Sequence, residues 1–273
     1  MEIIMIANYH THTFRCGHAA PDDERIYVEN AIKAGFTDMG FADHCPMPLP
    51  KGYTQEQCSK VLGVRMKLDE TEQYVNTLLR LREEYKNDIN IHIGFEVEYI
   101  PESFELFLEY IEQYPIEYLI LGQHFNGLLN DCHWFGRKTS DENILKQYVD
   151  LVCEGMKTGK FTYLCHPDLC WYYGFIEIYE REMTRLINCA NEHKIPLEIN
   201  FYGMQQLRNY PTLQFWQLAS RMGCDVVLGS DAHFPENVCN AGALRQAEEL
   251  VAAYKGLNLL QKVEFASPFK KHN

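Results

Sequence analysis

The chain has 273 residues, 46% of them hydrophobic, and a formal net charge of −13. This length and apolar content suffice for one large buried core, so we expect residues 1–273 to form a single domain. The acidic balance argues against sequence-independent binding to nucleic acid, which requires a basic surface. It still permits a small anionic substrate, provided that metal ions supply local positive charge.

The sequence predicts neither a targeting segment nor a membrane span. The apolar run at the N-terminus is short and has no basic region before it, unlike a secretory signal peptide. No stretch approaches the roughly 18 apolar residues that a membrane span requires. The ten cysteines form no CxxC pair and no dense framework, so we expect reduced thiols and a cytoplasmic location.

Short segments rich in β-branched and apolar residues alternate with longer segments of helical periodicity. The expected strands lie near residues 3–9, 36–42, 89–97, 116–123, 161–165, 195–201 and 225–230. The expected helices lie near residues 22–34, 65–86, 102–113, 141–157, 176–193, 212–222 and 238–254. This alternation is typical of α/β proteins with buried parallel strands. Seven such units favour a closed or nearly closed barrel over a doubly wound open sheet with one crevice at its switch point.

Residues able to bind metal follow nearly every expected strand. In chain order they are His10, His12, His18, His44, Glu96, His124, His166, Asp231 and His233. Imidazole nitrogens and carboxylate oxygens suit zinc, iron and manganese. Because the carboxyl ends of barrel strands share one mouth, side chains from successive strands would meet there. The pattern therefore predicts a barrel and a metal centre together.

Two pairs within this set share a spacing that strengthens the prediction. His10 and His12 are two residues apart, which places both imidazoles on one face of a strand, and Asp231 and His233 repeat that spacing. The pairs follow the first and last expected strands, which become neighbours when a barrel closes. A single histidine at a strand end is more often structural. We interpret four histidines in that way: His92, His133, His193 and His272.

Parity along the strands separates ligands from other buried groups. Glu96 and Glu98 have the same parity, so both could face the barrel interior. Glu96 is favoured as a ligand because it follows the strand core directly. Cys165 has the opposite parity to His166, which predicts a buried thiol there.

Two long loops would overhang the end of the barrel that carries the ligands. Residues 46–64 follow His44, and residues 125–140 follow His124. Long loops in such positions commonly contact the substrate. We therefore expect both loops to contribute to a binding pocket.

The metal-binding motifs occur in a fixed order along the chain. They are His10-Thr11-His12-Thr13, Cys16, His18, Gly35-Phe36-Thr37, Asp43-His44, Gly94-Phe95-Glu96, Gly122-Gln123-His124, His166-Pro167, Glu198-Ile199-Asn200 and Gly229-Ser230-Asp231-Ala232-His233. In this order they resemble the PHP (polymerase and histidinol phosphatase) superfamily, and within it the histidinol-phosphatase branch. The resemblance covers nearly the whole chain. It implies a distorted (β/α)7 barrel with a trinuclear metal site at the C-terminal ends of the strands.

The resemblance assigns the nine ligands to three divalent transition-metal ions, which could be zinc, iron or manganese. The first ion would be held by His10, His12, Glu96 and Asp231. The second would be held by His124, His166 and a bridging Glu96, and the third by His18, His44 and His233. All nine positions carry residues able to ligate metal, which separates this chain from degenerate family members that have lost the metal.

The resemblance also implies the chemistry. A metal lowers the pKa of bound water from about 15.7 to roughly 7, and a metal-bridging hydroxide would attack the phosphorus of a phosphomonoester in line. Glu96, Asp231 and His12 would form the catalytic set. The implied reaction is the hydrolysis of L-histidinol phosphate in histidine biosynthesis. The alternatives are another PHP phosphoesterase, acting on nucleotides or phosphotyrosine, and a non-catalytic metal-binding domain.

One departure from the family pattern concerns the phosphate contact. Many relatives carry an arginine soon after a Glu-x-Asn-x-x-Gly stretch, whereas here the basic residue is displaced to Arg208. A guanidinium offers a planar fork that suits phosphate. Arg208 and Arg15 are therefore the expected substrate contacts, with Arg137 as a weaker candidate.

Overall fold

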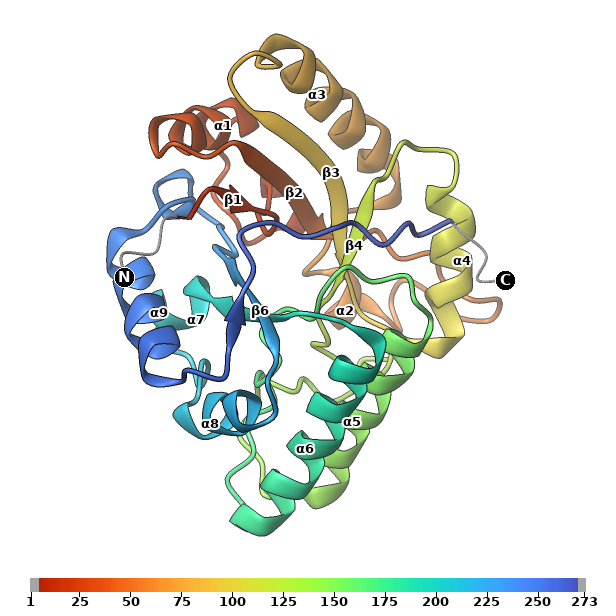
Figure 1. Ribbon diagram of the computed structural model, residues 1–273. Coiled ribbons are helices and arrows are strands. Elements are labelled where there is room, and N and C mark those ends of the chain that lie inside the picture. Colours follow the sequence, from red (N-terminus) through yellow and green to blue (C-terminus); the bar gives the residue numbers. More distant parts are fainter. Residues whose placement is uncertain (1–4, 270–273) are drawn as a thin grey trace.

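Parallel pairing arranges the strands into two sheets in a computed structural model that describes residues 5–269 (Figure 1). The first sheet has the order β1 (Ala7–Asn8), β2 (Asp38–His44), β3 (Asn90–Val97) and β4 (Tyr118–Leu121). The second has the order β5 (Leu197–Asn200), β6 (Asp225–Gly229) and β7 (Asn258–Leu259). Every strand pair is parallel. The protein thus has an α/β fold with a curled parallel sheet.

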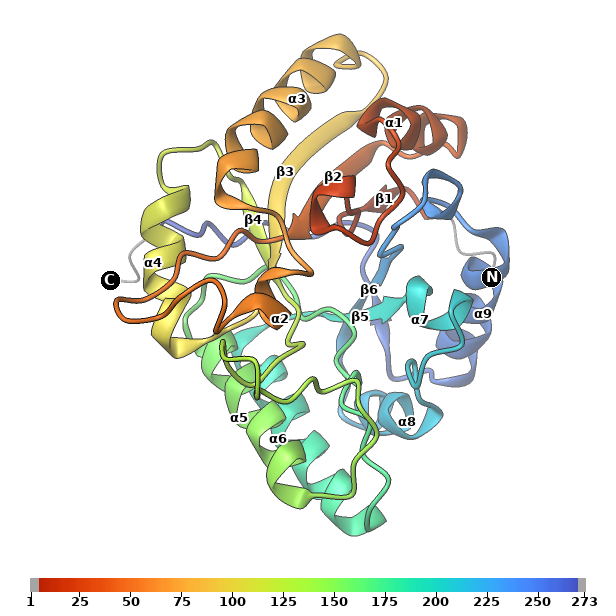
Figure 2. The ribbon, with the colours of Figure 1, turned by 180° about the vertical axis from the view of Figure 1, so that it is seen from behind.

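Helices follow the strands and lie around the outside of the curled sheet (Figures 1 and 2). The longer ones are α1 (Glu24–Lys33), α3 (Thr71–Glu84), α4 (Pro101–Ile111), α5 (Glu142–Lys157), α6 (Ile176–His193), α8 (Leu213–Arg221) and α9 (Ala241–Ala253). The short ones are α2 (Ser59–Leu62), α7 (Phe201–Gln205) and the 3-10 helices η1 (Phe14–Cys16), η2 (Leu68–Glu70) and η3 (Pro235–Asn237). Between residues 5 and 269, no helix combines the length and apolar character needed to cross a membrane.

Local sequence explains where several helices begin. The side chain of Asp23 accepts a hydrogen bond from the backbone N–H of Arg25 and caps α1. Asp141 caps α5 in the same way, and Pro101 occupies the first turn of α4. Carboxylates accept hydrogen bonds from the free backbone N–H groups at a helix start. Proline is also favoured in the first turn, because a residue there has no hydrogen-bond acceptor within the helix and the missing N–H costs nothing. The predicted helices therefore agree with the observed ones except at their ends.

The predicted strand at residues 161–165 is not a continuous strand. Only Leu164 forms bridges, one to Leu121 and one to Leu197. On the β5 side, the backbone N–H of Leu164 donates to the carbonyl of Pro196 at 3.0 Å. Proline has no N–H to extend that ladder toward residue 162. Within residues 5–9 the predicted first strand is too long, because only Ala7–Asn8 form β1, and the prediction missed β7. Residues 3 and 4 of that predicted strand and the histidine at position 272 lie outside the described residues.

Single bridged residues connect the two sheets at both sides. Leu164 links β4 to β5, and Thr11 pairs with Ala232 beyond the ends of β1 and β6. Around the second bridge, the backbone N–H of His12 donates to the carbonyl of Ala232 at 3.0 Å. The segments that follow the first strand and β6 therefore lie side by side, as the two ligand pairs require.

An aromatic core fills the inner face of the sheet beneath the ligands. The chain after β7 crosses the strands (Figure 1) and delivers Phe265 to this core. The Phe265 ring stacks on Tyr118 with centroids 4.6 Å apart and contacts the edge of Tyr9 at 5.3 Å. A Cβ at Gly94 would lie 2.6 Å from the Tyr118 ring, so only glycine leaves room for it. This packing closes one end of the sheet and leaves the other end for the site.

Candidate metal centre

Strand register brings the predicted ligands together at the carboxyl ends of the strands. His44 ends β2 and is the direct register partner of Glu96 on β3. The other ligands follow strand ends: His10 and His12 follow β1, His124 follows β4, His166 follows the Leu164 bridge, and Asp231 and His233 follow β6. Because all of these strands are parallel, the ligands share one end of the sheet. His18, just after η1, joins them from the first loop.

The Glu96 carboxylate lies at the middle of this cluster. It is 1% exposed, and five imidazoles surround it. Its Oε1 faces His166 at 2.8 Å and His124 at 3.5 Å. Its Oε2 faces His44 at 3.1 Å, His10 at 3.5 Å and His12 at 3.6 Å. A carboxylate with imidazoles at both oxygens can bridge two cations.

Three potential metal-ligating atoms converge beside Glu96. The Nε2 atoms of His10 and His12 face each other at 3.2 Å, and Asp231 Oδ1 lies 3.0 Å from His12 Nε2. Within the described residues, Asp231 Oδ1 and His233 Nε2 are buried with no hydrogen-bond partner. Buried polar atoms nearly always have a partner, and a cation would supply one here. The residues present therefore fit divalent transition-metal ions.

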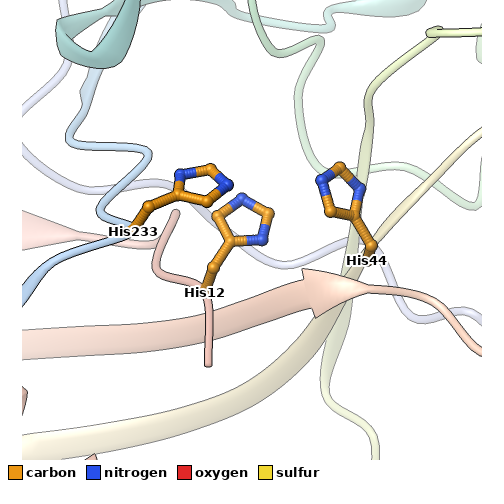
Figure 3. A group of neighbouring side chains, drawn as sticks. All are labelled: His12, His44 and His233. Carbon is orange, nitrogen blue, oxygen red and sulfur yellow. The ribbon is translucent and has the colours of Figure 1, made fainter. Parts of the chain in front are cut away.

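A third group of imidazoles lies next to these atoms. Figure 3 shows His12 and His233 side by side, with His44 rising from the end of β2 near them. The ligand atoms of these three residues lie within 4.8 Å of one another. The ring of His18 lies 4.8 Å from that of His233 and 5.2 Å from that of His44, measured between centroids. The structure thus brings together all nine predicted ligands.

Three carboxylates to which the sequence analysis gave no role contact candidate ligand histidines. Each lies at the ring nitrogen that points away from the centre of the cluster. Their contacts are Glu198 with His10 Nδ1 at 2.7 Å, Asp43 with His12 Nδ1 at 3.4 Å and Glu98 with His124 Nδ1 at 3.2 Å. Carboxylates in this position orient the ring and make the imidazole a better ligand. Glu198 and Asp43 lie inside the family motifs, and this position was the sequence signal that could have indicated their role.

The surroundings of Glu98 separate its role from that of Glu96. Arg65 donates from both terminal guanidinium nitrogens to Glu98, at 2.9 and 3.0 Å, and both side chains are buried. Burial raises the pKa of Glu98, but Arg65 and His124 lower it to about 2. Glu98 is therefore a charged and already paired carboxylate, whereas Glu96 has only imidazoles as charged neighbours. This difference favours Glu96 as the metal ligand.

The electrostatics of the cluster suit cation binding at neutral pH. Burial raises the pKa of Glu96 and Asp231, but the surrounding imidazoles hold both well below their usual range. Burial, followed by the neighbouring His12, lowers the pKa of His233 to about 3. Burial also holds the pKa of His44 well below its ordinary value. Ionised carboxylates and neutral imidazoles are the forms that bind metal. The neighbouring carboxylates outweigh burial at His10 and His12, whose pKa is raised to about 10 and well above the ordinary value, respectively, so an entering cation would displace protons from these two imidazoles.

Cys165 lies closer to the centre than strand parity predicted. Its Sγ is 3.6 Å from Glu96 Oε1, because residues 161–165 do not form a continuous strand. The thiol donates to the carbonyl of Leu121 at 2.9 Å. Burial raises its pKa well above the ordinary value, which keeps it a neutral thiol rather than a thiolate ligand.

A cavity of about 770 Å³ opens at the cluster and reaches outward between the loops. Lys60 and Val64 from the first long loop and Phe125 and Trp134 from the second line its walls, as expected for overhanging loops. Metal ligands, including Glu96 and Asp231, also line it. The cavity thus gives a small molecule access to the candidate metal centre.

The two arginines predicted to bind phosphate differ in position. Arg208 lines the cavity, and its guanidinium carbon lies 5.6 Å from the centroid of the Tyr202 ring. Arg15 is 5% exposed, forms an ion pair with Glu24 and is absent from the cavity lining. Arg137 is also absent from the lining. Geometry therefore favours Arg208 as the phosphate contact.

Buried carboxylates and imidazoles at the ends of parallel strands define the class of a metal-binding α/β protein. The PHP domain family model matches residues 8–201, and the chain belongs to that family. The "Probable histidinol-phosphatase" of Deinococcus radiodurans is 25% identical over 239 residues, which cover 85% of this chain and 88% of the relative. The histidinol-phosphatase of Bacillus subtilis is 27% identical over 253 residues, which cover 82% of this chain and 92% of the relative.

A solved structure supports the same fold. It is the histidinol phosphate phosphatase of Lactococcus lactis in complex with zinc, L-histidinol and phosphate. The TM-score is 0.65 at 18% identity, and the match covers 95% of this chain and 99% of that chain. At this identity the likeness establishes the fold.

Gly122 offers a test of the Glu96 position. A Cβ at residue 122 would lie 2.0 Å from Glu96 Oε1, so Gly122→Ala must displace the carboxylate. We expect zinc affinity to fall by at least about tenfold, measured by competition with a chelator. Gly127→Ala is the matched control, because its Cβ would meet only Cys132 at 3.9 Å. Equal zinc affinities in the two variants would contradict the central position of Glu96.

Proposed function

We propose that the protein is a metal-dependent phosphomonoester hydrolase that converts L-histidinol phosphate to L-histidinol and phosphate. The observation that best supports this proposal is the buried Glu96 carboxylate, which lies among five imidazoles at the wall of the cavity. Two curated relatives named as histidinol-phosphatases each align with more than four-fifths of the chain. The neighbouring Lactococcus lactis structure contains zinc, L-histidinol and phosphate.

We further propose three divalent ions, zinc, iron or manganese, held by the three ligand sets of the family. The metal-ligating groups found around His10, His12 and His233 support this proposal. We regard residues 1–273 as one domain with a distorted (β/α)7 barrel, supported by the bridges at Leu164 and Thr11. We also propose a cytoplasmic location, supported by ten cysteines that are all free thiols, as is usual in a reducing compartment.

When bound, the ions would activate a water molecule as the nucleophile and neutralise charge on the phosphate. Glu96 and Asp231, which are ionised at neutral pH, and His12 would hold the catalytic centre. Burial lowers the pKa of His12, but its hydrogen bonds to Asp231 and Asp43 raise it well above the ordinary value, so a bound cation would displace a proton from this imidazole. Asp43 fixes the ring of His12 through Nδ1, so that Nε2 points to the centre. Arg208, at the cavity wall, would donate a charge-assisted hydrogen bond to a nonbridging phosphate oxygen.

A substrate panel tests the proposed function. Protein reconstituted with zinc or manganese is expected to show a higher kcat/KM for L-histidinol phosphate than for nucleoside monophosphates or phosphotyrosine, measured by phosphate release. Comparable or better rates on nucleotides or phosphotyrosine would assign the chain to another group of PHP phosphoesterases. Failure to hydrolyse any ester, p-nitrophenyl phosphate included, would indicate a non-catalytic metal-binding domain.

We expect different losses of activity when Glu96 and Glu98 are each replaced by glutamine. Glu96→Gln and His12→Ala are each expected to lower kcat by several orders of magnitude, since both remove a group at the centre of the cluster. Glu98→Gln should be milder, because Glu98 is paired with Arg65 and reaches the cluster only through the Nδ1 atom of His124. Steady-state kinetics with circular dichroism as a folding control distinguish the variants. A greater loss in Glu98→Gln would show that the bridging ligand was wrongly chosen.

We expect that replacing Arg208 weakens substrate binding without loss of metal. Removing a charge-assisted contact costs roughly 1.5–3 kcal/mol, which is about ten- to a hundredfold in kcat/KM. Arg208→Ala should therefore lower kcat/KM by that factor while the metal content stays the same. Arg137→Ala is the control, since Arg137 does not line the cavity. If both variants retain kcat/KM within about twofold of wild type, Arg208 is a surface residue.

A further inference from the structure

Two tryptophans line the cavity without contributing to the candidate metal centre. Trp134 and Trp171 remain 40% and 41% exposed, whereas Trp216 is fully buried in the core. Trp134 lies in the second long loop, and Trp171 follows His166 by five residues. Large aromatic surfaces left open inside a cavity are typical of small-molecule sites. The hydrolysis proposed above uses neither indole.

The two indoles are held in place by backbone hydrogen bonds between their loops. The backbone N–H of Trp171 donates to the carbonyl of Phe135 at 3.0 Å, and that of Thr139 donates to the carbonyl of Trp171 at 2.9 Å. Trp134 also forms an antiparallel bridge with Phe125. A Cβ at Gly136 would lie 2.6 Å from the Trp134 ring, so the indole packs directly on this glycine. The aromatic walls are therefore a built feature of the cavity.

The charges along the lining restrict what the walls can bind. Glu96 and Asp231 face the imidazoles of the metal centre, and Glu98 is paired with Arg65. Among the residues that line the cavity, no further carboxylate is available to a cationic group. A flat ring with partial positive charge can instead bind to indole faces by stacking and cation–π attraction. Imidazole is a flat aromatic ring that stacks on indole in its neutral form and adds cation–π attraction when it is protonated.

We propose that Trp134 and Trp171 form the subsite for the leaving alcohol and recognise its imidazole ring. The inference rests on the proposed function and deepens it, because it assigns the preference for histidinol phosphate to two indoles rather than to the metal ligands. The phosphate would occupy the metal end of the cavity. The ring would lie between the loops, where the walls are aromatic.

Ethanolamine phosphate provides the comparison, since it retains the phosphate ester and the ammonium group but lacks the ring. Trp134→Ala and Trp171→Ala are each expected to lower the ratio of kcat/KM for L-histidinol phosphate to that for ethanolamine phosphate by roughly tenfold. Phe175→Ala is the matched control, because Phe175 is 72% exposed and does not line the cavity. Tyr173 is unsuitable, since the ammonium group of Lys138 lies over both its ring and that of Trp171. An unchanged ratio in both tryptophan variants would overturn the subsite.

Tryptophan fluorescence tests the subsite independently of turnover. Titration of the metal-loaded wild type with L-histidinol should change the emission, and Trp134→Phe and Trp171→Phe should each reduce that change and weaken the apparent binding. The buried Trp216 contributes a constant background. No emission change with millimolar L-histidinol would overturn the subsite. If the wild type does not hydrolyse L-histidinol phosphate, the proposed function is refuted. The fluorescence titration alone would then show whether the two indoles bind the imidazole ring.

Discussion

The burial of two carboxylates among imidazoles is the constraint on which the rest of the structure depends. Glu96 and Asp231 are 1% and 4% exposed, and neither contacts an arginine or a lysine within the described part of the chain. Burial of charge without compensation is strongly unfavourable. Burial lowers the pKa of His10, but Glu198, Asp231 and Glu96 raise it to about 10, so this imidazole can offset part of the buried charge. Burial instead lowers the pKa of His44 and His233, which leaves these two imidazoles neutral. Bound cations would offset the remaining cost, which favours the cluster as a metal centre.

This constraint extends into the backbone. His166 and Asp231 both have positive φ angles, of 31° and 49°, in a region that non-glycine residues seldom occupy. Such angles turn the chain sharply at the strand ends and direct both side chains into the cluster. Gly122 and Gly229 leave room for the carboxylates of Glu96 and Glu198. Unfavourable backbone conformations therefore occur where the side chains of the cluster converge.

Sequence patterns predicted what depends on short-range physics. The helices predicted near residues 22–34 and 141–157 begin at the caps Asp23 and Asp141, and the His-x-His spacing of His10 and His12 indicated a shared face. Prediction was wrong at residues 161–165, because the effect of Pro196 on the ladder depends on which segments become neighbours.

Contacts between distant segments explain the other gaps in the prediction. Glu198 reaches His10 across 188 positions of the chain, a pairing that only the folded sheet creates. The meeting of two loops at Trp134 and Trp171 has the same origin. The ion pair that buries Arg15 is more local, because Glu24 lies only nine residues further along the chain. Residue type and spacing predicted the candidate ligands, whereas the carboxylates that contact them and the walls of the cavity depend on tertiary structure.

Elemental analysis of protein purified without chelators tests the central claim most directly. Nine ligands in three sets predict about three divalent transition-metal ions per chain, each with three or four protein ligands. A content of one ion or none, even after reconstitution with zinc, iron or manganese, would contradict a trinuclear centre.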